Sequence, residues 1–332
     1  MESPAVSVVV DNFNYGRFLK QCLESVIAQD YPREKLEIIL VDDGSTDDSI
    51  KVAEQFSKRV KIVPRRNGGQ AEAFNTGLRQ AGGDLIMFLD SDDYWDRDKV
   101  RVIADCFKDP AIGIVQHPLL DVDADGRALP TSIPRWPSRY TLRDFLKGGA
   151  ALAAASGLAV RSSVIDKIGP IPWDIAWASD IYMIVHGLFH TDALNFPQAK
   201  GYHRIHGANN WAEGYSSPKK LRMGLELQKT FDRYLAPRLK EKGLDYSPEY
   251  RFLEDLDTAR REILASMYEG RSSEARARWR ALFKKHGLTR LGAFRCGTLL
   301  LALASPELYV RTYDLYRTRH WLVRLRGKVL PD

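Results

Sequence analysis

Runs of apolar, β-branched residues alternate with helical patterns over the first part of the chain. Strands are expected where the apolar segments are short and nearly unbroken, at 6–10, 37–41, 60–63 and 85–89. Apolar residues recur at helical spacing in 15–29 and 70–81, and a further helix is expected to begin at a Ser45 or Thr46 cap. This alternation predicts an α/β fold, a doubly wound, mostly parallel sheet with helices on both faces.

The pattern changes after the fourth predicted strand, although the same domain continues. Further strands are expected at 112–117 and 157–161, with a tight turn at 121–126 between them. Beyond residue 216 the chain has the pattern of long amphipathic helices, at 219–235, 250–267 and 272–285. We therefore expect one domain over residues 1–216 and a basic, mainly helical C-terminal region over residues 217–332.

Composition narrows the class of protein. With 332 residues, 44% of them hydrophobic, the chain is long enough to bury a full-sized core. Cys22, Cys106 and Cys296 form neither a disulfide framework nor a CxxC pair, which favours a cytoplasmic location and speaks against zinc. The N-terminus lacks a signal-peptide pattern, and the longest charge-free runs fall short of the ~20 apolar residues that span a bilayer. No transmembrane helix is expected.

Basic residues gather in the C-terminal part. Residues 219–332 hold 25 Lys and Arg against 14 Asp and Glu, whereas residues 1–218 hold 24 against 29. The bias is strongest in 275–332, with 13 basic and 3 acidic side chains. It suggests peripheral contact with an anionic membrane on its cytoplasmic face, and a solvated helical face is the alternative. Nucleic acid is not an expected partner, because the tail carries no recognised binding motif.

Two acidic clusters directly follow predicted strands. Asp42-Asp43 comes after the second strand, and Asp90-Ser91-Asp92-Asp93 comes after the fourth. In a doubly wound sheet ligands bind beyond the carboxyl ends of the strands, so both clusters are expected at the binding edge. Short carboxylates there suit a divalent cation that neutralises a diphosphate. A DxD pattern alone is weak evidence, because Asp and Ser are also common at strand ends and helix caps.

Residues 6–100 resemble the family 2 glycosyltransferases of the GT-A fold, with five motifs in the family's order. They are VVVDNFNY at 8–15, SVIAQ at 25–29, IILVDDGSTD at 38–47, NGGQ at 67–70 with NTG at 75–77, and GD at 83–84 leading to FLDSDD at 88–93. The second half continues the resemblance with SGLAVRSS at 156–163, KIG at 167–169, ASDIYM at 178–183 and YHRIHG at 202–207. The resemblance implies an inverting enzyme that takes a sugar from a nucleotide diphosphate.

The resemblance also implies contacts with the nucleotide. Phe13 matches an aromatic beside the base, with a core aromatic as the alternative, and Asp43 matches a carboxylate that accepts a hydrogen bond from the base. This favours UDP over GDP or dTDP. Asp11 departs from the family, which commonly carries Pro, Thr or Ala there. The full set of expected nucleotide contacts is Asp11, Phe13, Asn14, Asp43, Gln70, Asn75, Asp90 and Ser91.

The same resemblance implies the metal site and the base. Asp92 matches the principal ligand of Mn²⁺ or Mg²⁺, and Asp93 is expected to orient the site. Asp90 is expected as a second metal ligand or a ribose contact. His206 is expected as a metal ligand or a contact to the diphosphate, with a surface histidine as the alternative. Asp180 matches the general base, although it lies in ASDIYM, where Ser stands in place of the family's usual Glu. A helix cap is the alternative role for Asp180.

Tryptophans near these motifs supply the expected acceptor contacts. Trp173, Trp177 and Trp211 are expected to stack on sugar rings, with burial in a core as the alternative. Asp121 to Gly126 imitates the start of a calcium loop, but Ser132 stands where such a loop needs Glu, so a turn explains the segment better.

The resulting hypothesis is a metal-dependent, inverting glycosyltransferase. Its donor is expected to be a UDP-sugar, and its acceptor a saccharide or a lipid-linked molecule in surface polysaccharide or glycoconjugate synthesis. The alternative is a catalytically degenerate, transferase-like scaffold at the membrane surface. Turnover of nucleotide sugars and its loss on changing Asp92 distinguish the two.

Overall fold

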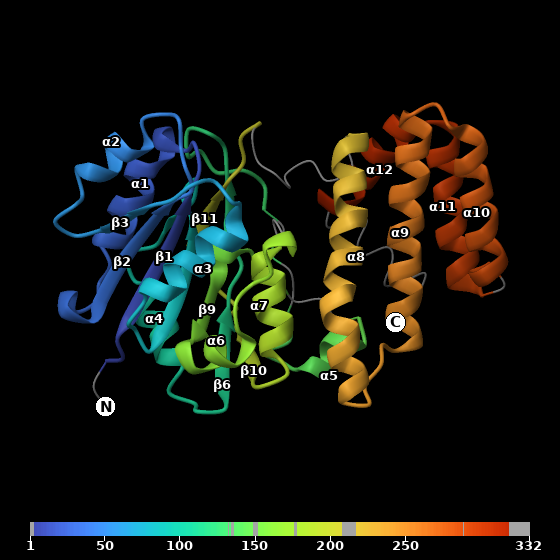
Figure 1. Cartoon of the computed structure of the whole chain (residues 1–332). Coiled ribbons are helices and arrows are strands. Elements are labelled where there is room, and N and C mark those ends of the chain that lie inside the picture. Colours follow the sequence, from blue (N-terminus) through green and yellow to red (C-terminus); the bar gives the residue numbers. More distant parts are fainter. Residues whose placement is uncertain are drawn as a thin grey trace. The chain divides into compact units, whose positions relative to one another are not determined.

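The computed structural model describes residues 3–131, 133, 136–148, 152–175, 178–207, 217–287 and 289–318. The chain divides into two compact units, the first made of residues 1–145 and 149–206 and the second of 146–148 and 207–332. Every strand of the described residues belongs to the first unit (Figure 1). The expected boundary after residue 216 stays a prediction, because residues 208–216 lie outside the described part of the chain.

An eight-stranded sheet forms the centre of the first unit, in the order β3-β2-β1-β4-β9-β6-β10-β8. The bounds are β1 Val6–Asn12, β2 Leu36–Asp42, β3 Lys61–Pro64, β4 Leu85–Asp90, β6 Ile112–Gln116, β8 Arg139–Tyr140, β9 Leu158–Arg161 and β10 Asp192–Asn195. Strands β1 to β4 are parallel, as are β6 and β10, whereas β9 runs against both β4 and β6 and β8 runs against β10. The expected mostly parallel sheet is confirmed.

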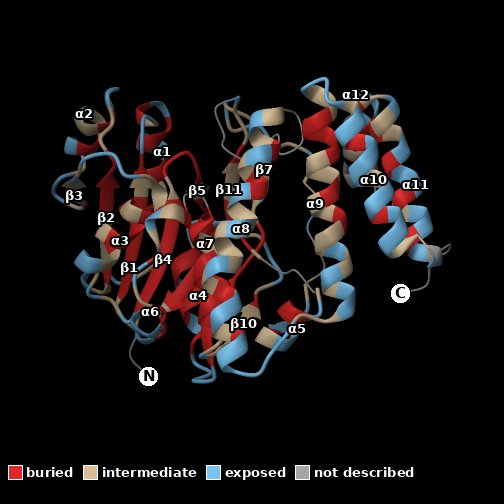
Figure 2. Cartoon of the chain, turned by 45° about the vertical axis from the view of Figure 1, so that its right-hand side comes forward, coloured by how far each residue is buried: buried red, intermediate tan, exposed pale blue. Residues whose placement is uncertain are grey.

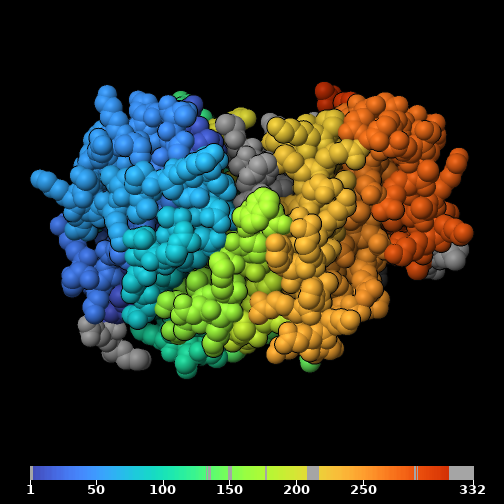
Figure 3. All heavy atoms as spheres, viewed as in Figure 1, coloured from blue at the N-terminus to red at the C-terminus, as the bar shows by residue number. Residues whose placement is uncertain are grey.

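Alternate side chains of the central strands face two helical layers. Val8 and Val10 pack with Leu19 and Leu23 in a core shared by α1 (Gly16–Ile27), α2 (Ser49–Glu54) and α4 (Lys99–Cys106). The opposite face meets α3 (Gln70–Gln80), α6 (Ser162–Ile168) and α7 (Ser179–Gly187). Figure 2 shows the strands as buried between these layers, and the side chains of the second layer close the front of the unit in Figure 3. Burial on both faces explains why these strands are unbroken apolar runs.

A three-stranded sheet lies beside the carboxyl edge, in the order β5-β11-β7. Its strands are β5 Tyr94–Trp95, β7 Leu120–Val122 and β11 Gly201–Arg204. The first unit also contains α5 Leu142–Leu146, shared with the second unit, and the 3-10 turns η1 Arg33–Lys35, η2 Ala155–Gly157 and η3 Trp173–Ile175. Pairing of β11 with β5 and β7 brings the chain around residue 204 next to the segment that follows β4.

One expected helix start is wrong. The N-cap of α2 is Asp48, and neither Ser45 nor Thr46 caps the helix. The Ser45 hydroxyl instead donates to Asp42 Oδ1 at 2.6 Å, and Asn12 Nδ2 donates to the same oxygen at 2.7 Å. The side chain of Ser45 therefore stabilises the end of β2 and does not cap the helix.

Helices build the second unit, as expected. They are α8 Pro218–Glu241, α9 Pro248–Tyr268, α10 Ser272–His286, α11 Arg290–Ala304 and α12 Pro306–Thr318. Ser217 and Ser247 cap α8 and α9 through hydrogen bonds from the main-chain N–H groups three residues on, and a proline follows each serine. Leu221, Leu256 and Ile263 pack in the core of this unit. No helix among the described residues is long and apolar enough to cross a membrane.

Candidate active site

The ends of β1 and β4 bring carboxylates together at the carboxyl edge of the sheet. Asp11 lies opposite Asp90 in the strand register, and a tight turn from Asp90 to Asp93 follows β4. Burial raises the pKa of Asp11 to about 7, and burial and the charge of Asp92 raise the pKa of Asp93 to about 7. Burial and the neighbouring carboxylates also raise the pKa of Asp90 well above its usual value. Burial and the neighbouring carboxylates thus favour the protonated forms of Asp90 and Asp93.

His206 reaches the cluster from the segment after β11. Its Nε2 lies 3.0 Å from Asp92 Oδ2, and the two side chains are only 7% and 9% exposed. The imidazole ring contacts two aromatic rings of the α1 segment, with ring centroids 5.3 Å away for Tyr15 and 4.7 Å away for Phe18. Tyr15 also faces the acidic cluster, since burial and the charge of Asp92 both raise the pKa of its hydroxyl. Sequence reasoning did not select Tyr15 as a site residue.

The Asp92 carboxylate and the His206 imidazole lie next to each other, and both are groups that bind cations in proteins. Among the described residues, no three or more His, Cys, Asp or Glu side chains are arranged to hold a metal ion. Mg²⁺ and similar cations are commonly bound through one or two protein ligands, with water and substrate phosphates completing the coordination. Asp11 Oδ1 is buried in the same cluster and accepts no hydrogen bond. The residues present therefore fit a divalent cation that shares its coordination with a diphosphate.

Asp43 orders the loop that leads into α3. Its carboxylate pairs with Arg65 and accepts hydrogen bonds from Gly68 N at 3.0 Å and from Gly69 N at 2.7 Å. Gly69 has φ +87°, in the region that favours glycine. The next residue, Gln70, donates from Nε2 to Asp90 Oδ1 at 3.1 Å. This loop therefore connects the two acidic clusters.

Phe13 lies on an ordered turn at the same edge of the sheet. Asn14 adopts φ 59°, and its Oδ1 accepts a hydrogen bond from Thr46 N at 2.7 Å, while its own N–H donates to Ser45 Oγ at 2.9 Å. The neighbouring ring of Phe13 is 45% exposed. It is therefore not a core side chain, and its exposed face is open to stacking.

Two further expected nucleotide contacts, Asn75 and Ser91, are buried. Asn75 is buried, its Nδ2 donates to the Ile171 carbonyl at 2.7 Å, and its Oδ1 accepts from Ile171 N at 2.9 Å. Because both ends of its amide are occupied, the geometry gives Asn75 the role of tying α3 to the segment before η3. Ser91 is buried in the turn after β4, where its N–H donates to the Asp11 carbonyl at 3.2 Å.

Asp180 is the second residue of α7. The N-cap of this helix is Ala178, so Asp180 is not the capping residue, although its Oδ1 accepts a hydrogen bond from Ile181 N at 2.7 Å. Burial raises the pKa of Asp180 to about 6 and outweighs the opposing effect of the backbone of Ile181 and Ala155. Such a carboxyl group is ionised at neutral pH and is more basic than an exposed one.

Ser156, in η2, holds the end of β4 and was not selected from the sequence. Its hydroxyl accepts a hydrogen bond from Asp90 N at 3.1 Å, and its carbonyl accepts from Lys99 Nζ at 2.6 Å and from Trp95 Nε1 at 3.0 Å. The Lys99 ammonium lies 3.3 Å from the centroid of the Trp95 ring, and burial lowers its pKa well below the usual value. The segment before β9 thereby supports the acidic turn.

Arg204 joins three segments around the site. Its Nε donates to the Asp92 carbonyl at 2.8 Å, its Nη1 to the Ala124 carbonyl at 2.9 Å and its Nη2 to Gln21 Oε1 at 2.7 Å. Its main-chain N–H donates to Asp93 Oδ1 at 2.8 Å. The turn around Ala124, which imitates a calcium loop in sequence, is therefore an acceptor for this arginine.

Two of the three expected acceptor contacts, Trp177 and Trp211, lie outside the described residues. Trp173, in η3, is described and is 74% exposed. A tryptophan with this much free surface at the start of the segment that leads to Asp180 is available for stacking on a ligand.

Residues 7–169 match the sequence profile of Glycosyl transferase family 2. The chain belongs to glycosyl transferase family 2. One member, the uncharacterized glycosyltransferase alr2836 of Nostoc sp., is 35% identical over 216 residues, which make up 62% of this chain and 66% of that protein. The chain covers between 14% and 31% of the length of three further curated members. The family match includes Asp11, Asp43 and Asp90.

Solved structures of similar fold come from two other glycosyltransferases. A Staphylococcus aureus TarS structure in complex with UDP has a TM-score of 0.54 and 18% identity, covering 86% of this chain and 93% of its own. The mannosyltransferase PcManGT of Pyrobaculum calidifontis, in complex with GDP-Man and Mn²⁺, has a TM-score of 0.59 and 19% identity, covering 100% of this chain and 89% of its own. At these identities the likeness concerns the fold, and it confirms the GT-A fold that the family's motifs imply.

Proposed function

We propose that this chain is an inverting, metal-dependent glycosyltransferase that moves a sugar from a UDP-sugar to a hydroxyl of a saccharide or lipid-linked acceptor. The observation that carries the proposal is the contact of His206 Nε2 with Asp92 Oδ2, at 3.0 Å, inside a cluster of buried carboxylates. Membership in family 2 supports sugar transfer as the reaction class. We place the reaction in the synthesis of surface polysaccharides or glycoconjugates.

Asp180 is the proposed base. It accepts the proton of the acceptor hydroxyl while the hydroxyl oxygen forms a bond to the anomeric carbon of the donor. The bond between that carbon and the diphosphate oxygen breaks on the opposite face, so the configuration inverts and the nucleoside diphosphate leaves with the electron pair. The raised pKa of Asp180, about 6, suits this role, because the group is ionised at neutral pH and still takes up a proton readily.

Asp92, Asp90 and His206 are the proposed ligands of Mn²⁺ or Mg²⁺. Bound there, the cation would neutralise the charge of the departing diphosphate. The protein keeps these groups in place, because Gln70 Nε2 donates to Asp90 Oδ1 and Arg204 Nε donates to the Asp92 carbonyl. The nucleotide base of a bound donor would stack on the exposed ring of Phe13. Asp43, which also orders the loop at Gly68, would accept a hydrogen bond from that nucleotide base.

UDP is the proposed nucleotide. Because the two solved structures hold different nucleotides, the identity of the nucleotide needs a direct test. TarS was solved with UDP and the mannosyltransferase with GDP-Man. The experiment incubates the full chain with UDP-, GDP- and dTDP-sugars in Mn²⁺ and measures release of the nucleoside diphosphate, with Asp92→Ala in parallel. Release from UDP-sugars that is lost in Asp92→Ala supports the proposal. If the wild type neither turns over a nucleotide sugar nor binds UDP, the result favours the alternative, a catalytically degenerate scaffold at the membrane surface.

Residues 275–332 are the proposed site of peripheral contact with an anionic membrane. In the described part of this region, Phe294, Leu300 and Leu308 are 53%, 49% and 51% exposed. Apolar side chains that project from a basic region suit a surface with apolar tails beneath anionic headgroups. Flotation of the full chain with vesicles that contain or lack anionic lipid tests the contact. Absence of binding to anionic vesicles at low salt would reject it.

A further inference from the structure

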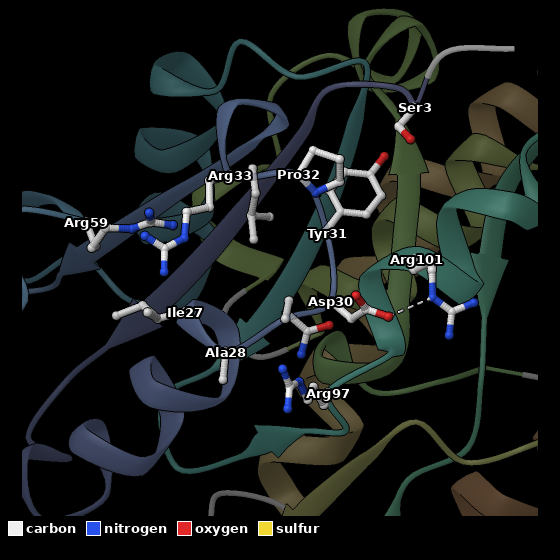
Figure 4. A pocket seen from close by; sticks show the side chains of 12 residues that line it. Ser3, Ile27, Ala28, Asp30, Tyr31, Pro32, Arg33, Arg59, Arg97 and Arg101 are labelled. Atoms are coloured by element: carbon white, nitrogen blue, oxygen red, sulfur yellow. Dashed lines mark hydrogen bonds and ion pairs between the residues drawn. The ribbon is translucent and has the colours of Figure 1, made fainter.

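A second concave site lies in the first unit, away from the acidic cluster. It has a volume of about 540 Å³ and is lined by Arg33, Arg59, Arg97 and Arg101, which we call the arginine pocket. Figure 4 shows their side chains around the turn from Ala28 to Pro32 that follows α1. The volume lies within the range of ~300–1,000 Å³ that is typical of sites for small ligands. No step of the proposed sugar transfer uses these residues.

The arginine pocket lies at the amino ends of the parallel strands. Leu36, the first residue of β2, lines it, and Arg59 comes just before β3 begins at Lys61. The carboxylates Asp11 and Asp90 lie at the opposite ends of β1 and β4. A strand of seven residues separates its ends by roughly 20 Å. A ligand in the arginine pocket therefore occupies a site distinct from that of the donor.

Among the described residues, acidic side chains pair with only one of the four arginines of the arginine pocket. Arg101 pairs with Asp30 at 3.2 Å and approaches Asp98 at 3.8 Å. In the part of the chain that the structure describes, Arg33, Arg59 and Arg97 make no ion pair. Figure 4 shows the side chains of Arg33 and Arg59 extending toward one another. Like charges that converge on one concavity repel each other, and an anion bound between them removes that repulsion.

The wall of the arginine pocket is preformed. Gln29 is buried, its Nε2 donates to the Ser25 carbonyl at 2.9 Å and to the Asp96 carbonyl at 2.8 Å, and its Oε1 accepts from Val100 N at 2.9 Å. The main-chain N–H of Asp30 donates to the Arg97 carbonyl at 2.8 Å. The turn is thus fixed to the segment that carries Arg97. A ligand meets the arginines without first ordering this backbone, which lowers the cost of binding.

We propose that the arginine pocket binds a small phosphorylated molecule. The guanidinium group presents paired N–H donors that match two phosphate oxygens, and such charge-assisted contacts are among the strongest hydrogen bonds in proteins. Ile27, Leu36 and Tyr31 add apolar surface beside the arginines, so the pocket offers space and contact to the rest of the ligand. The phosphate comes from a soluble metabolite or from a lipid headgroup, and the recognition chemistry is the same.

The test measures binding of pyrophosphate and inorganic phosphate to the full chain by titration calorimetry. EDTA is present, because diphosphate binding at the acidic cluster is proposed to need a divalent cation. The variant carries Arg33→Gln, Arg59→Gln and Arg97→Gln. The matched control, Lys51→Gln, Lys58→Gln and Lys167→Gln, removes the same charge from exposed lysines that do not line the pocket. A parallel arm uses phosphatidylcholine vesicles with and without phosphatidic acid, and thermal unfolding checks that both variants are folded.

The expected result is binding by the wild type and the lysine control, weakened at least ten-fold in the arginine variant. Loss confined to the soluble phosphates identifies a metabolite site, and loss confined to vesicles with phosphatidic acid identifies a lipid headgroup site. The proposal is overturned if the wild type binds no probe in either arm. It is equally overturned if the arginine and lysine variants weaken binding to the same extent, since the effect is then one of total charge.

Discussion

His206 Nε2 and Asp92 Oδ2 lie 3.0 Å apart, although 114 positions separate the two residues in the chain. Two features of the fold produce this contact. The pairing of β11 with β5 and β7 carries the chain to the carboxyl edge, and Arg204 then binds the carbonyl of Asp92 just before His206 is reached. The contact is thus a consequence of the small sheet as well as of the acidic turn.

The first prediction concerns His206. The change His206→Ala is expected to raise the Mn²⁺ concentration needed for half-maximal activity by about ten-fold or more, because one proposed ligand is lost. Titrating activity against Mn²⁺ measures the effect. The matched control is His190→Ala, which removes an exposed imidazole after α7. An unchanged Mn²⁺ requirement in His206→Ala would remove this residue from the metal site.

The second prediction concerns Asp180. The change Asp180→Asn keeps the size of the side chain and removes the proton acceptor, so kcat is expected to fall by about 10²- to 10⁴-fold. Donor binding, measured as UDP affinity in Mn²⁺, is expected to stay within about two-fold, since Asp180 has no proposed role in holding the nucleotide. The control Asp166→Asn changes an exposed carboxylate of α6. Comparable losses in both variants would argue against a catalytic role.

The third prediction concerns the pH dependence of kcat that the titration of Asp180 produces. Because the base acts in its ionised form and its pKa is raised to about 6, kcat is expected to fall as the pH drops below 6. Each further unit should then lower kcat by about ten-fold. A pH profile at saturating donor, acceptor and Mn²⁺ measures the midpoint. A midpoint near 4 would mean that a carboxyl group with an ordinary pKa controls the rate.

The fourth prediction tests the packing of α3 on the sheet. A Cβ atom at Gly77 would lie 2.3 Å from Val9 Cγ1 and 3.3 Å from Val41 Cγ2. The change Gly77→Ala is therefore expected to lower the free energy of unfolding by about 1–3 kcal/mol, as in other overpacked cores. Urea unfolding measures it. Gly82→Ala is the control, since no atom lies within 4 Å of its Cβ position. Equal stability of the two variants would show that α3 shifts at little cost.

The fifth prediction concerns His203, beside the site. Burial opposes its charge, but the hydrogen bond to Asp121 and the charge of Asp93 outweigh burial and raise its pKa to about 9. The stabilisation by protonated His203 is thus fully present below about pH 6.5, the unfolded value, and is lost as the pH rises through 9. The change Asp121→Asn should lower the free energy of unfolding by about 1 kcal/mol at pH 6 and by less at pH 10. The value is discounted because the side chains of His203 and Asp121 are partly exposed.

Urea unfolding at the two pH values tests this expectation. Asp125→Asn is the matched control, because Asp125 lies in the same turn with its side chain 64% exposed. It should change the free energy of unfolding little at either pH. A loss in Asp121→Asn that is the same at pH 6 and pH 10 would show that the titration of His203 is not its source.

Much of the fold was predictable because its central strands are buried on both faces. Val8, Ile39 and Phe88 belong to apolar runs that mark β1, β2 and β4 in the sequence. Strands β5 and β8 have only two residues each, too few for a periodic pattern. The reversed direction of β9 was also not predictable, since apolar runs carry no information on strand direction.

Motifs in the sequence indicated the candidate residues that carry chemistry, whereas residues that act through tertiary contacts gave no signal. The acidic turn and His206 follow from their motifs, and the structure brings Asp92 and His206 together. Lys99 gave no signal, because a lysine at a helix start is ordinarily solvated, yet here it is buried against the Ser156 carbonyl. The motif around Asn75 indicated a ligand contact, which stays a prediction, and the hydrogen bonds of its amide with Ile171 could not be read from the motif.

Strand β9 runs against β4, so its first residues, and not its last, lie at the edge that carries the carboxylates. Ser156 therefore enters the site on the incoming chain and binds the main chain of Asp90 there. Sequence changes upstream of Ser156 would alter the surroundings of the site while the register of β1 and β4 stays the same. The surroundings of the carboxylates can in this way change through one connecting segment, without any change in the strands that carry Asp11 and Asp90.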